Sequence, residues 1–156
     1  MIKLFADGAD KKGILEMYQD QKIAGFTTNP TLMRKAGISN YTEFAKDILI
    51  AIKDKPISFE VFADKFTEME WQAMEIAGWG ENVYVKIPIM NTKGEYSYDQ
   101  IEKLSRSGVR LNITAIMTLD QVKKVSGAVK ESPSCFVSVF AGRIADTGVD
   151  PIPVMQ

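Results

Sequence analysis

Hydrophobic positions along the chain alternate between two kinds of segment. Short runs rich in Val, Ile, Phe and Thr predict β-strands, in which successive side chains point to opposite faces. These runs occupy residues 2–7, 24–29, 56–63, 82–89, 109–117 and 135–142. Between them, apolar residues recur every three or four positions, as on the buried side of an α-helix. The helices predicted in this way cover residues 11–22, 41–53, 65–79, 97–106 and 119–129.

Two further segments carry helix signals. Ser97 is followed three residues later by Gln100, which predicts a capping box at the start of the helix at 97–106. Residues 150–156 look like a helix that has just begun, with a proline near its first turn. No low-complexity linker or domain boundary interrupts the chain, so residues 1–156 are expected to form a single domain.

Polar side chains interrupt the strands on one face only. Because side chains alternate along a strand, Glu60 and Lys86 each lie opposite an apolar face. The other strands repeat this arrangement with Asp7, Thr27, Asn29, Asn112, Thr114 and Ser138. In a flat, doubly wound sheet both faces meet helices, and burying these groups would be costly. In a barrel they converge on one interior, near the C-terminal mouth where barrel enzymes carry their sites, so we favour a TIM-type (β/α)8 barrel in the α/β class.

The number of strands falls short of that barrel. The sequence supplies about six βα units, whereas a complete TIM-type barrel contains eight. It therefore predicts a single barrel domain over residues 1–156 that is incomplete at its C-terminus. Two origins stay open: a truncated copy of a longer parent, which we prefer, or a chain whose missing quarter is supplied by another chain.

Charge and hydropathy remove several classes of partner. The formal net charge is −1 and the basic residues are scattered, so neither a nucleic acid nor a membrane surface is expected as a partner. No apolar stretch approaches the roughly 18 residues of a membrane helix. The N-terminus is a strand pattern rather than a signal peptide. The single cysteine, Cys135, fits a reducing compartment, so a cytoplasmic protein is expected.

The absence of histidine limits the chemistry further. The chain has 0 histidines, which excludes Ser-His-Asp and Cys-His catalysis within one chain and makes a typical zinc site unfavourable. Lysine and carboxylates remain the candidate reactive groups, and neither a metal nor a cofactor is expected.

Lys86 stands in the middle of the apolar run VYVKIPI, at residues 83–89. Lysine is almost never fully buried unless its charge is compensated. One interpretation is a structural ion pair with Glu60, although buried pairs rarely gain stability over apolar residues. The other is a nucleophile, because an apolar surrounding favours the free amine, which can attack a ketone and form a Schiff base. Asp7, Glu60 and Thr114 would then supply the acids and bases.

Four motifs occur in a fixed order along the chain. They are GFTTNPTLMRKAG (25–37), VYVKIPI (83–89), RLNITAIMTLDQ (110–121) and SVFAGRIADTG (138–148). Together they resemble the transaldolase family, particularly its short, bacterial-type branch that includes fructose-6-phosphate aldolase. The resemblance implies a homo-oligomeric enzyme of the pentose phosphate pathway. Such an enzyme moves a dihydroxyacetone unit between sugar phosphates through a lysine Schiff base, without metal or cofactor.

The resemblance assigns catalytic roles to four residues. Lys86 matches the Schiff-base lysine, and Asp7 matches an aspartate that handles the proton of the substrate C4 hydroxyl. Glu60 and Thr114 match the pair that holds a catalytic water and moves protons around the carbinolamine.

Substrate contacts are implied in the same way. The matching positions are Thr27, Asn29, Asn112, Ser138, Phe140 and Arg143. The two asparagines would hold substrate hydroxyls, Ser138 would lie near the C1 hydroxyl, and Arg143 would bind the phosphate with its guanidinium fork. Alternatives exist for two of them. Asn29 before Pro30 could simply make a turn, and Arg143 could form a surface ion pair with Asp146.

Two positions bear on the branch of the family. Fructose-6-phosphate aldolases typically carry Gln in place of Glu60 and Tyr in place of Phe140, so both residues favour transaldolase transfer. Three functions nevertheless stay open. They are a transaldolase, an aldolase that releases or accepts free dihydroxyacetone, and an inactive truncated barrel that binds sugar phosphates or assembles with partners. The activity of the 156-residue chain itself is a separate question.

Overall fold

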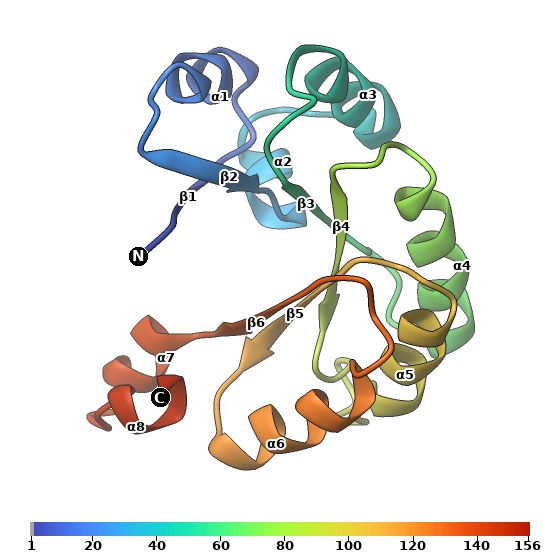
Figure 1. The fold of residues 1–156 in the computed structure, drawn as a ribbon, viewed down its shortest axis with the longest axis vertical. Coiled ribbons are helices and arrows are strands. Elements are labelled where there is room, and N and C mark those ends of the chain that lie inside the picture. Colours follow the sequence, from blue (N-terminus) through green and yellow to red (C-terminus); the bar gives the residue numbers. More distant parts are fainter. Residues whose placement is uncertain (1) are drawn as a thin grey trace.

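Six parallel strands form one curved sheet in the computed structural model, which describes residues 2–156 (Figure 1). The strands follow the order of the chain, and each pairs with the next. They are β1 (Leu4–Asp7), β2 (Ile23–Thr27), β3 (Ile57–Glu60), β4 (Val83–Pro88), β5 (Leu111–Ile116) and β6 (Cys135–Val139). This open half-barrel confirms the predicted α/β barrel type, with six of its strands present.

The helices are α1 (Lys11–Tyr18), α2 (Pro30–Lys35), α3 (Tyr41–Ala51), α4 (Phe66–Ala77), α5 (Tyr98–Arg106), α6 (Leu119–Ala128), α7 (Ala141–Asp146) and α8 (Ile152–Met155). Helices α1, α3, α4, α5 and α6 lie around the outer side of the curved sheet, whereas α7 and α8 lie beyond the end of β6 (Figure 1). Within residues 2–156, none of them is long and apolar enough to cross a membrane.

Several local predictions differ from the structure. Ser97 makes no side-chain cap, because its hydroxyl donates to the Pro88 carbonyl at 2.9 Å, and the capping box forms instead between Thr118 and Gln121. The strand predicted over 135–142 ends at Val139, since helix α7 begins two residues later. Helices α2 and α7 were not predicted.

The apolar faces of the central strands form the core. Their side chains point outward to the helices and are fully buried; the set comprises Ile57, Phe59, Val85, Ile87, Leu111 and Ile113. As predicted from the alternation of apolar and polar residues, the apolar face of these strands meets the helix layer and the polar face lines the inside.

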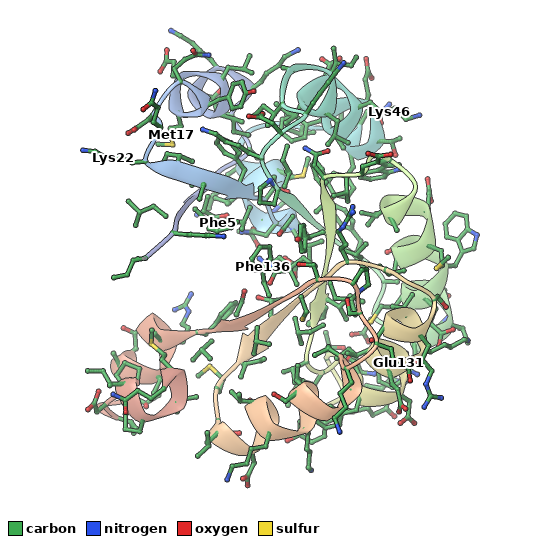
Figure 2. The ribbon with its side chains drawn as sticks, in the orientation of Figure 1. Phe5, Met17, Lys22, Lys46, Glu131 and Phe136 are labelled. Atoms are coloured by element: carbon green, nitrogen blue, oxygen red, sulfur yellow. The ribbon has the colours of Figure 1, made fainter. Side chains whose placement is uncertain are left out.

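Aromatic rings close the inner side of the sheet. Phe5 and Phe136 point toward one another from the two edge strands, with ring centroids 5.1 Å apart (Figure 2). The Tyr84 ring lies 4.5 Å from Phe136, and its hydroxyl donates to Ser134 at 2.7 Å. Gly25 leaves room for Phe5, because a Cβ on Gly25 would lie 2.4 Å from a carbon of that ring. This aromatic layer connects β1 to β6 without a backbone ladder between them.

The two outermost strands present apolar side chains to solvent. In the described part of the chain, β1 pairs only with β2, and β6 only with β5. Leu4 on β1 is 52% exposed and Val137 on β6 is 38% exposed. An edge of this kind offers free backbone groups and an apolar surface to another strand.

We expect the 156-residue chain to self-associate through these edges. Lysine on an edge strand opposes strand addition, so a variant combining Leu4→Lys with Val137→Lys should be less associated in light scattering. Ile50→Lys is the matched control, because Ile50 is 71% exposed on α3, away from either edge. An unmodified chain that is monomeric at high concentration would contradict this expectation.

Candidate active site

Lys86 and Glu60 face each other on adjacent strands inside the half-barrel. They are register partners on β4 and β3, and the Lys86 Nζ lies 3.2 Å from the Glu60 Oε2. Their side chains are only 11% and 17% exposed. A structural ion pair and a reactive amine beside a carboxyl both require this contact, so the pair alone does not choose between these two interpretations.

The environment of Glu60 alters its acidity. Burial raises the pKa of the Glu60 carboxyl above its ordinary value, and the charge of Asp7 acts in the same direction. The neighbouring Lys86 ammonium opposes this by lowering the same pKa, but burial is the larger effect. A carboxyl that holds its proton more readily is suited to general acid catalysis.

Asp7 ends β1 at the same rim of the sheet. It is the register partner of Thr27 on β2, and the Thr27 hydroxyl donates to the Asp7 Oδ1 at 2.7 Å. This hydrogen bond orients the carboxylate. Because Asp7 is exposed, a substrate can still reach the carboxylate. The Thr27 hydroxyl therefore orients the carboxylate of Asp7 in this structure.

A hydrogen-bonded row of side chains crosses the interior from β6 to β3. The Ser138 hydroxyl donates to the Asn112 Oδ1 at 2.6 Å, and the Asn112 Nδ2 donates to the Ser58 Oγ at 2.9 Å. Asn112 is also the register partner of Lys86, so this row lies beside the lysine. Ser58 was not among the predicted site residues, although the alternation that selected Glu60 also places Ser58 on the inner face.

Thr114 lies where the regular alternation of β5 ends. Its side chain is 2% exposed, and among the described residues its Oγ1 has no hydrogen-bond partner. The next residue, Ala115, adopts a φ of 61°, and the pairing with β6 shifts register between Ile113 and Ile116. A buried hydroxyl without a partner and a non-glycine residue with positive φ are each uncommon, and their occurrence side by side makes Thr114 a candidate functional position.

The other three predicted residues lie in or at the start of the helices that follow β2 and β6. Asn29 caps α2, because its Oδ1 accepts the Leu32 N–H at 2.9 Å. Arg143 on α7 is 74% exposed and lies 3.6 Å from Asp146, the surface pair considered as its alternative. Phe140, just before α7, is partly exposed. The structure therefore gathers Lys86, Glu60, Asp7, Thr27, Asn112 and Ser138 on the inner face of the strands, whereas Asn29, Phe140 and Arg143 remain at its margin.

Comparison with known proteins shows the family to which this chain belongs. The family described as Transaldolase/Fructose-6-phosphate aldolase matches residues 4–155. The chain belongs to that family.

Individual members of the transaldolase family resemble nearly the whole chain. A probable transaldolase from Dehalococcoides mccartyi is 38% identical over 149 residues, which cover 96% of this chain and 65% of the relative. A probable transaldolase from Streptococcus agalactiae is 34% identical over 155 residues, and one from Clostridium acetobutylicum is 35% identical. The chain thus spans about two thirds of the length of the curated relatives it matches, from 65% to 67% in these three.

A solved structure supports the fold alone. Dihydrodipicolinate synthase from Rhodopseudomonas palustris superposes with a TM-score of 0.58 at 17% sequence identity. The match covers 88% of this chain and 56% of that one. Its TIM-barrel fold agrees with a transaldolase-family half-barrel.

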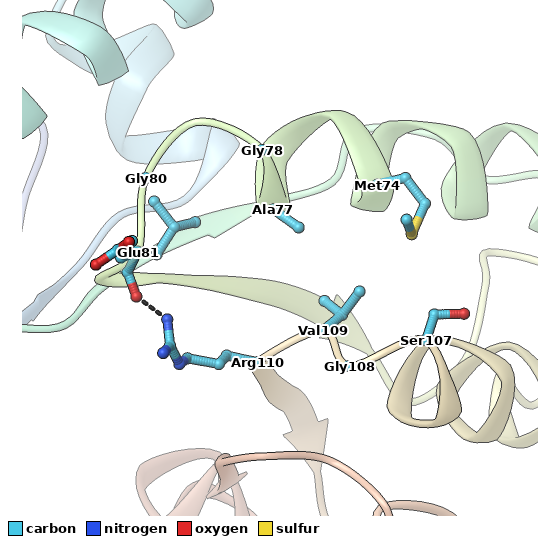
Figure 3. A pocket seen from close by; sticks show the side chains of 10 residues that line it. Met74, Ala77, Gly78, Gly80, Glu81, Ser107, Gly108, Val109 and Arg110 are labelled. Carbon is cyan, nitrogen blue, oxygen red and sulfur yellow. Dashed lines mark hydrogen bonds between the residues drawn. The ribbon is translucent and has the colours of Figure 1, made fainter.

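A separate hollow lies at the opposite end of the strands of this transaldolase-family chain (Figure 3). It encloses about 420 Å³ between the turn leading into β4 and the turn leading into β5. The Arg110 guanidinium donates there to the Glu81 carbonyl, which ties the two turns together. In barrel enzymes this N-terminal end serves stability, so the hollow is not part of the candidate active site.

Proposed function

We propose that the site forms a Schiff base between Lys86 and a ketose phosphate and transfers a dihydroxyacetone unit to an aldose phosphate. The observation that carries this proposal is the Lys86 amine 3.2 Å from the Glu60 carboxyl, on the inner face of parallel strands. The neighbouring carboxylate can exchange protons with the amine and with the oxygen that leaves as water.

In the first half-reaction the amine attacks the C2 carbonyl and forms a C–N bond. The resulting carbinolamine loses its oxygen as water, with the Glu60 carboxyl donating the proton, and an imine remains. Burial raises the pKa of Glu60, which favours that donation. The hydroxyl of Thr114, buried on the neighbouring strand, is proposed to assist this transfer.

Bond cleavage is assigned to Asp7. Its carboxylate takes the proton of the C4 hydroxyl, the C3–C4 bond breaks, and C4 leaves as the aldehyde of a first aldose phosphate. The electron pair of the broken bond moves into the protonated imine to give an enamine on Lys86. The enamine then attacks a second aldehyde, and the steps run in reverse to release the product. The row of Ser138, Asn112 and Ser58 offers donors and acceptors for substrate hydroxyls, and Arg143 is proposed to bind the phosphate.

Transfer is preferred to simple aldol cleavage because this chain carries Glu60 and Phe140, where fructose-6-phosphate aldolases typically have Gln and Tyr. Rates measured with and without an aldose phosphate acceptor separate the two reactions. A transaldolase needs the acceptor, whereas an aldolase releases free dihydroxyacetone without it.

The proposal is tested by reduction with borohydride in the presence of fructose 6-phosphate. The covalent adduct should map to the peptide that contains Lys86. Lys93 is the internal control, because it lies in the exposed loop after β4 and meets solvent freely. An adduct on Lys93, or adducts scattered over surface lysines, would show that Lys86 is not the nucleophile.

A further inference from the structure

The hydrogen-bond ladder between β2 and β3 stops just before Glu60. The Phe26 N–H donates to the Pro56 carbonyl at 2.8 Å, and the Thr28 N–H donates to the Ser58 carbonyl at 3.0 Å. Continuing in steps of two, residue 30 would donate to the carbonyl of Glu60. Residue 30 is proline, which has no N–H, so the chain itself cannot continue the ladder.

The Tyr41 side chain supplies the missing donor. Its hydroxyl, at the start of α3, donates to the Glu60 carbonyl oxygen at 3.0 Å. The ring is fixed by edge-to-face contacts with Phe62 and Trp79, at centroid distances of 4.7 Å and 5.3 Å. Burial raises the pKa of Tyr41, so the hydroxyl keeps its proton and remains a donor at any physiological pH.

The peptide group that joins Glu60 to Val61 is therefore held by two hydrogen bonds from opposite sides. Toward β4, the Val61 N–H donates to the Lys86 carbonyl at 3.1 Å. Toward β2, the bond from Tyr41 takes the place of a ladder bond. Glu60 is the last residue of β3, and the next backbone anchors are the Phe62 and Ala63 N–H groups, which donate to the Gln72 side chain. Loss of the Tyr41 bond would therefore leave the Glu60 carbonyl unheld on its β2 side.

We propose that Tyr41 is a positioning residue: by hydrogen-bonding the Glu60 backbone it holds the Glu60 carboxyl against the Lys86 amine. The inference deepens the proposed function and rests on it for its catalytic consequence. Its structural consequence, the orientation of the carboxyl, can be measured on the chain without any reaction.

The first test replaces Tyr41 by Phe, which keeps the ring and removes the hydroxyl. The charged and titratable groups that face Glu60 are Lys86 from β4, Asp7 from β1 and Tyr41 from α3. If the carboxyl moves away from Lys86, it loses the one group that lowers its pKa. The titration midpoint of Glu60, followed by carbon NMR and assigned with Glu60→Gln, should then rise.

Tyr18→Phe is the matched control. It removes a hydroxyl that donates to Asp54 at 2.6 Å on the outer surface, and it should leave the Glu60 midpoint unchanged. An unchanged midpoint in Tyr41→Phe overturns the inference. Equal midpoint shifts in the two variants overturn it as well, because they would report a general effect on the fold.

The second test measures the rate of borohydride trapping at saturating fructose 6-phosphate. Tyr41→Phe should slow trapping by about tenfold, since a misplacement of about 1 Å costs up to a hundredfold in well-oriented reactions. Its pH profile should shift toward higher pH together with the Glu60 midpoint. Normal trapping with a normal profile overturns the positioning role. Absence of any Lys86 adduct in the unmodified chain overturns the proposed function alone, because the Glu60 titration still decides the positioning.

Discussion

Lys86→Arg is expected to abolish the borohydride-trapped adduct completely. A guanidinium stays protonated and has no free amine with which to form an imine. Arginine keeps a positive charge beside Glu60, which matters because removing one partner of a buried pair costs about 3–5 kcal/mol. Loss of trapping would therefore result from the missing amine at residue 86, and not from destabilisation by an unpaired Glu60 carboxylate.

Two control measurements test this interpretation. Thermal unfolding of Lys86→Arg should remain cooperative, which shows that the larger side chain has been accommodated. Lys93→Arg, a change of the same kind in an exposed loop, should leave trapping unaffected. Trapping that persists in Lys86→Arg would mean that another lysine reacts, and the proposed function would have to be abandoned.

Alternation along the strands was sufficient to predict which side chains line the interior. It assigned Lys86, Glu60 and Asn112 to one face because period-2 spacing is a property of the strand itself. The fold class followed, since inward polar groups on every strand are compatible with a barrel and costly in a sheet covered on both faces. The strands lie within or close to the predicted apolar runs but are shorter, most of all in the run at 56–63, of which only Ile57–Glu60 is a strand.

Local signals at the ends of elements were less reliable. The pair Asn29 and Pro30 is a good helix start, with a capping side chain followed by proline at the first helical position, and it could have predicted α2. Ser97 has the sequence of a capping box, but the Pro88 carbonyl competes for its hydroxyl. Such competition comes from tertiary contacts, which spacing along the chain does not record.

Contacts between residues far apart in the chain could not be predicted from the sequence pattern. Tyr41 lies 19 residues from Glu60, and nothing in the pattern indicates that its hydroxyl replaces a ladder donor. The left-handed conformation of Ala115 was likewise not predictable, because alanine has no preference for positive φ. These features depend on how the strands are packed and registered in three dimensions.

Asp7→Asn is expected to separate bond cleavage from imine formation. The asparagine keeps the size of the side chain, and its carbonyl oxygen can still accept from Thr27, but the amide cannot take a proton from the substrate. Turnover should fall by roughly 10²–10⁴-fold, the range typical of a lost general acid or base. Trapping at Lys86 should persist, because the imine forms before Asp7 acts.

Asp10→Asn provides the matched control for this change. Asp10 lies three residues further along and caps α1, its Oδ2 accepting the Gly13 N–H at 2.8 Å, and asparagine caps helices equally well. Turnover is best compared in the chain joined to the C-terminal third of a transaldolase relative, since this chain spans 65% to 67% of such proteins. Full turnover in Asp7→Asn would remove Asp7 from the mechanism, whereas loss of both turnover and trapping would place its role in imine formation instead.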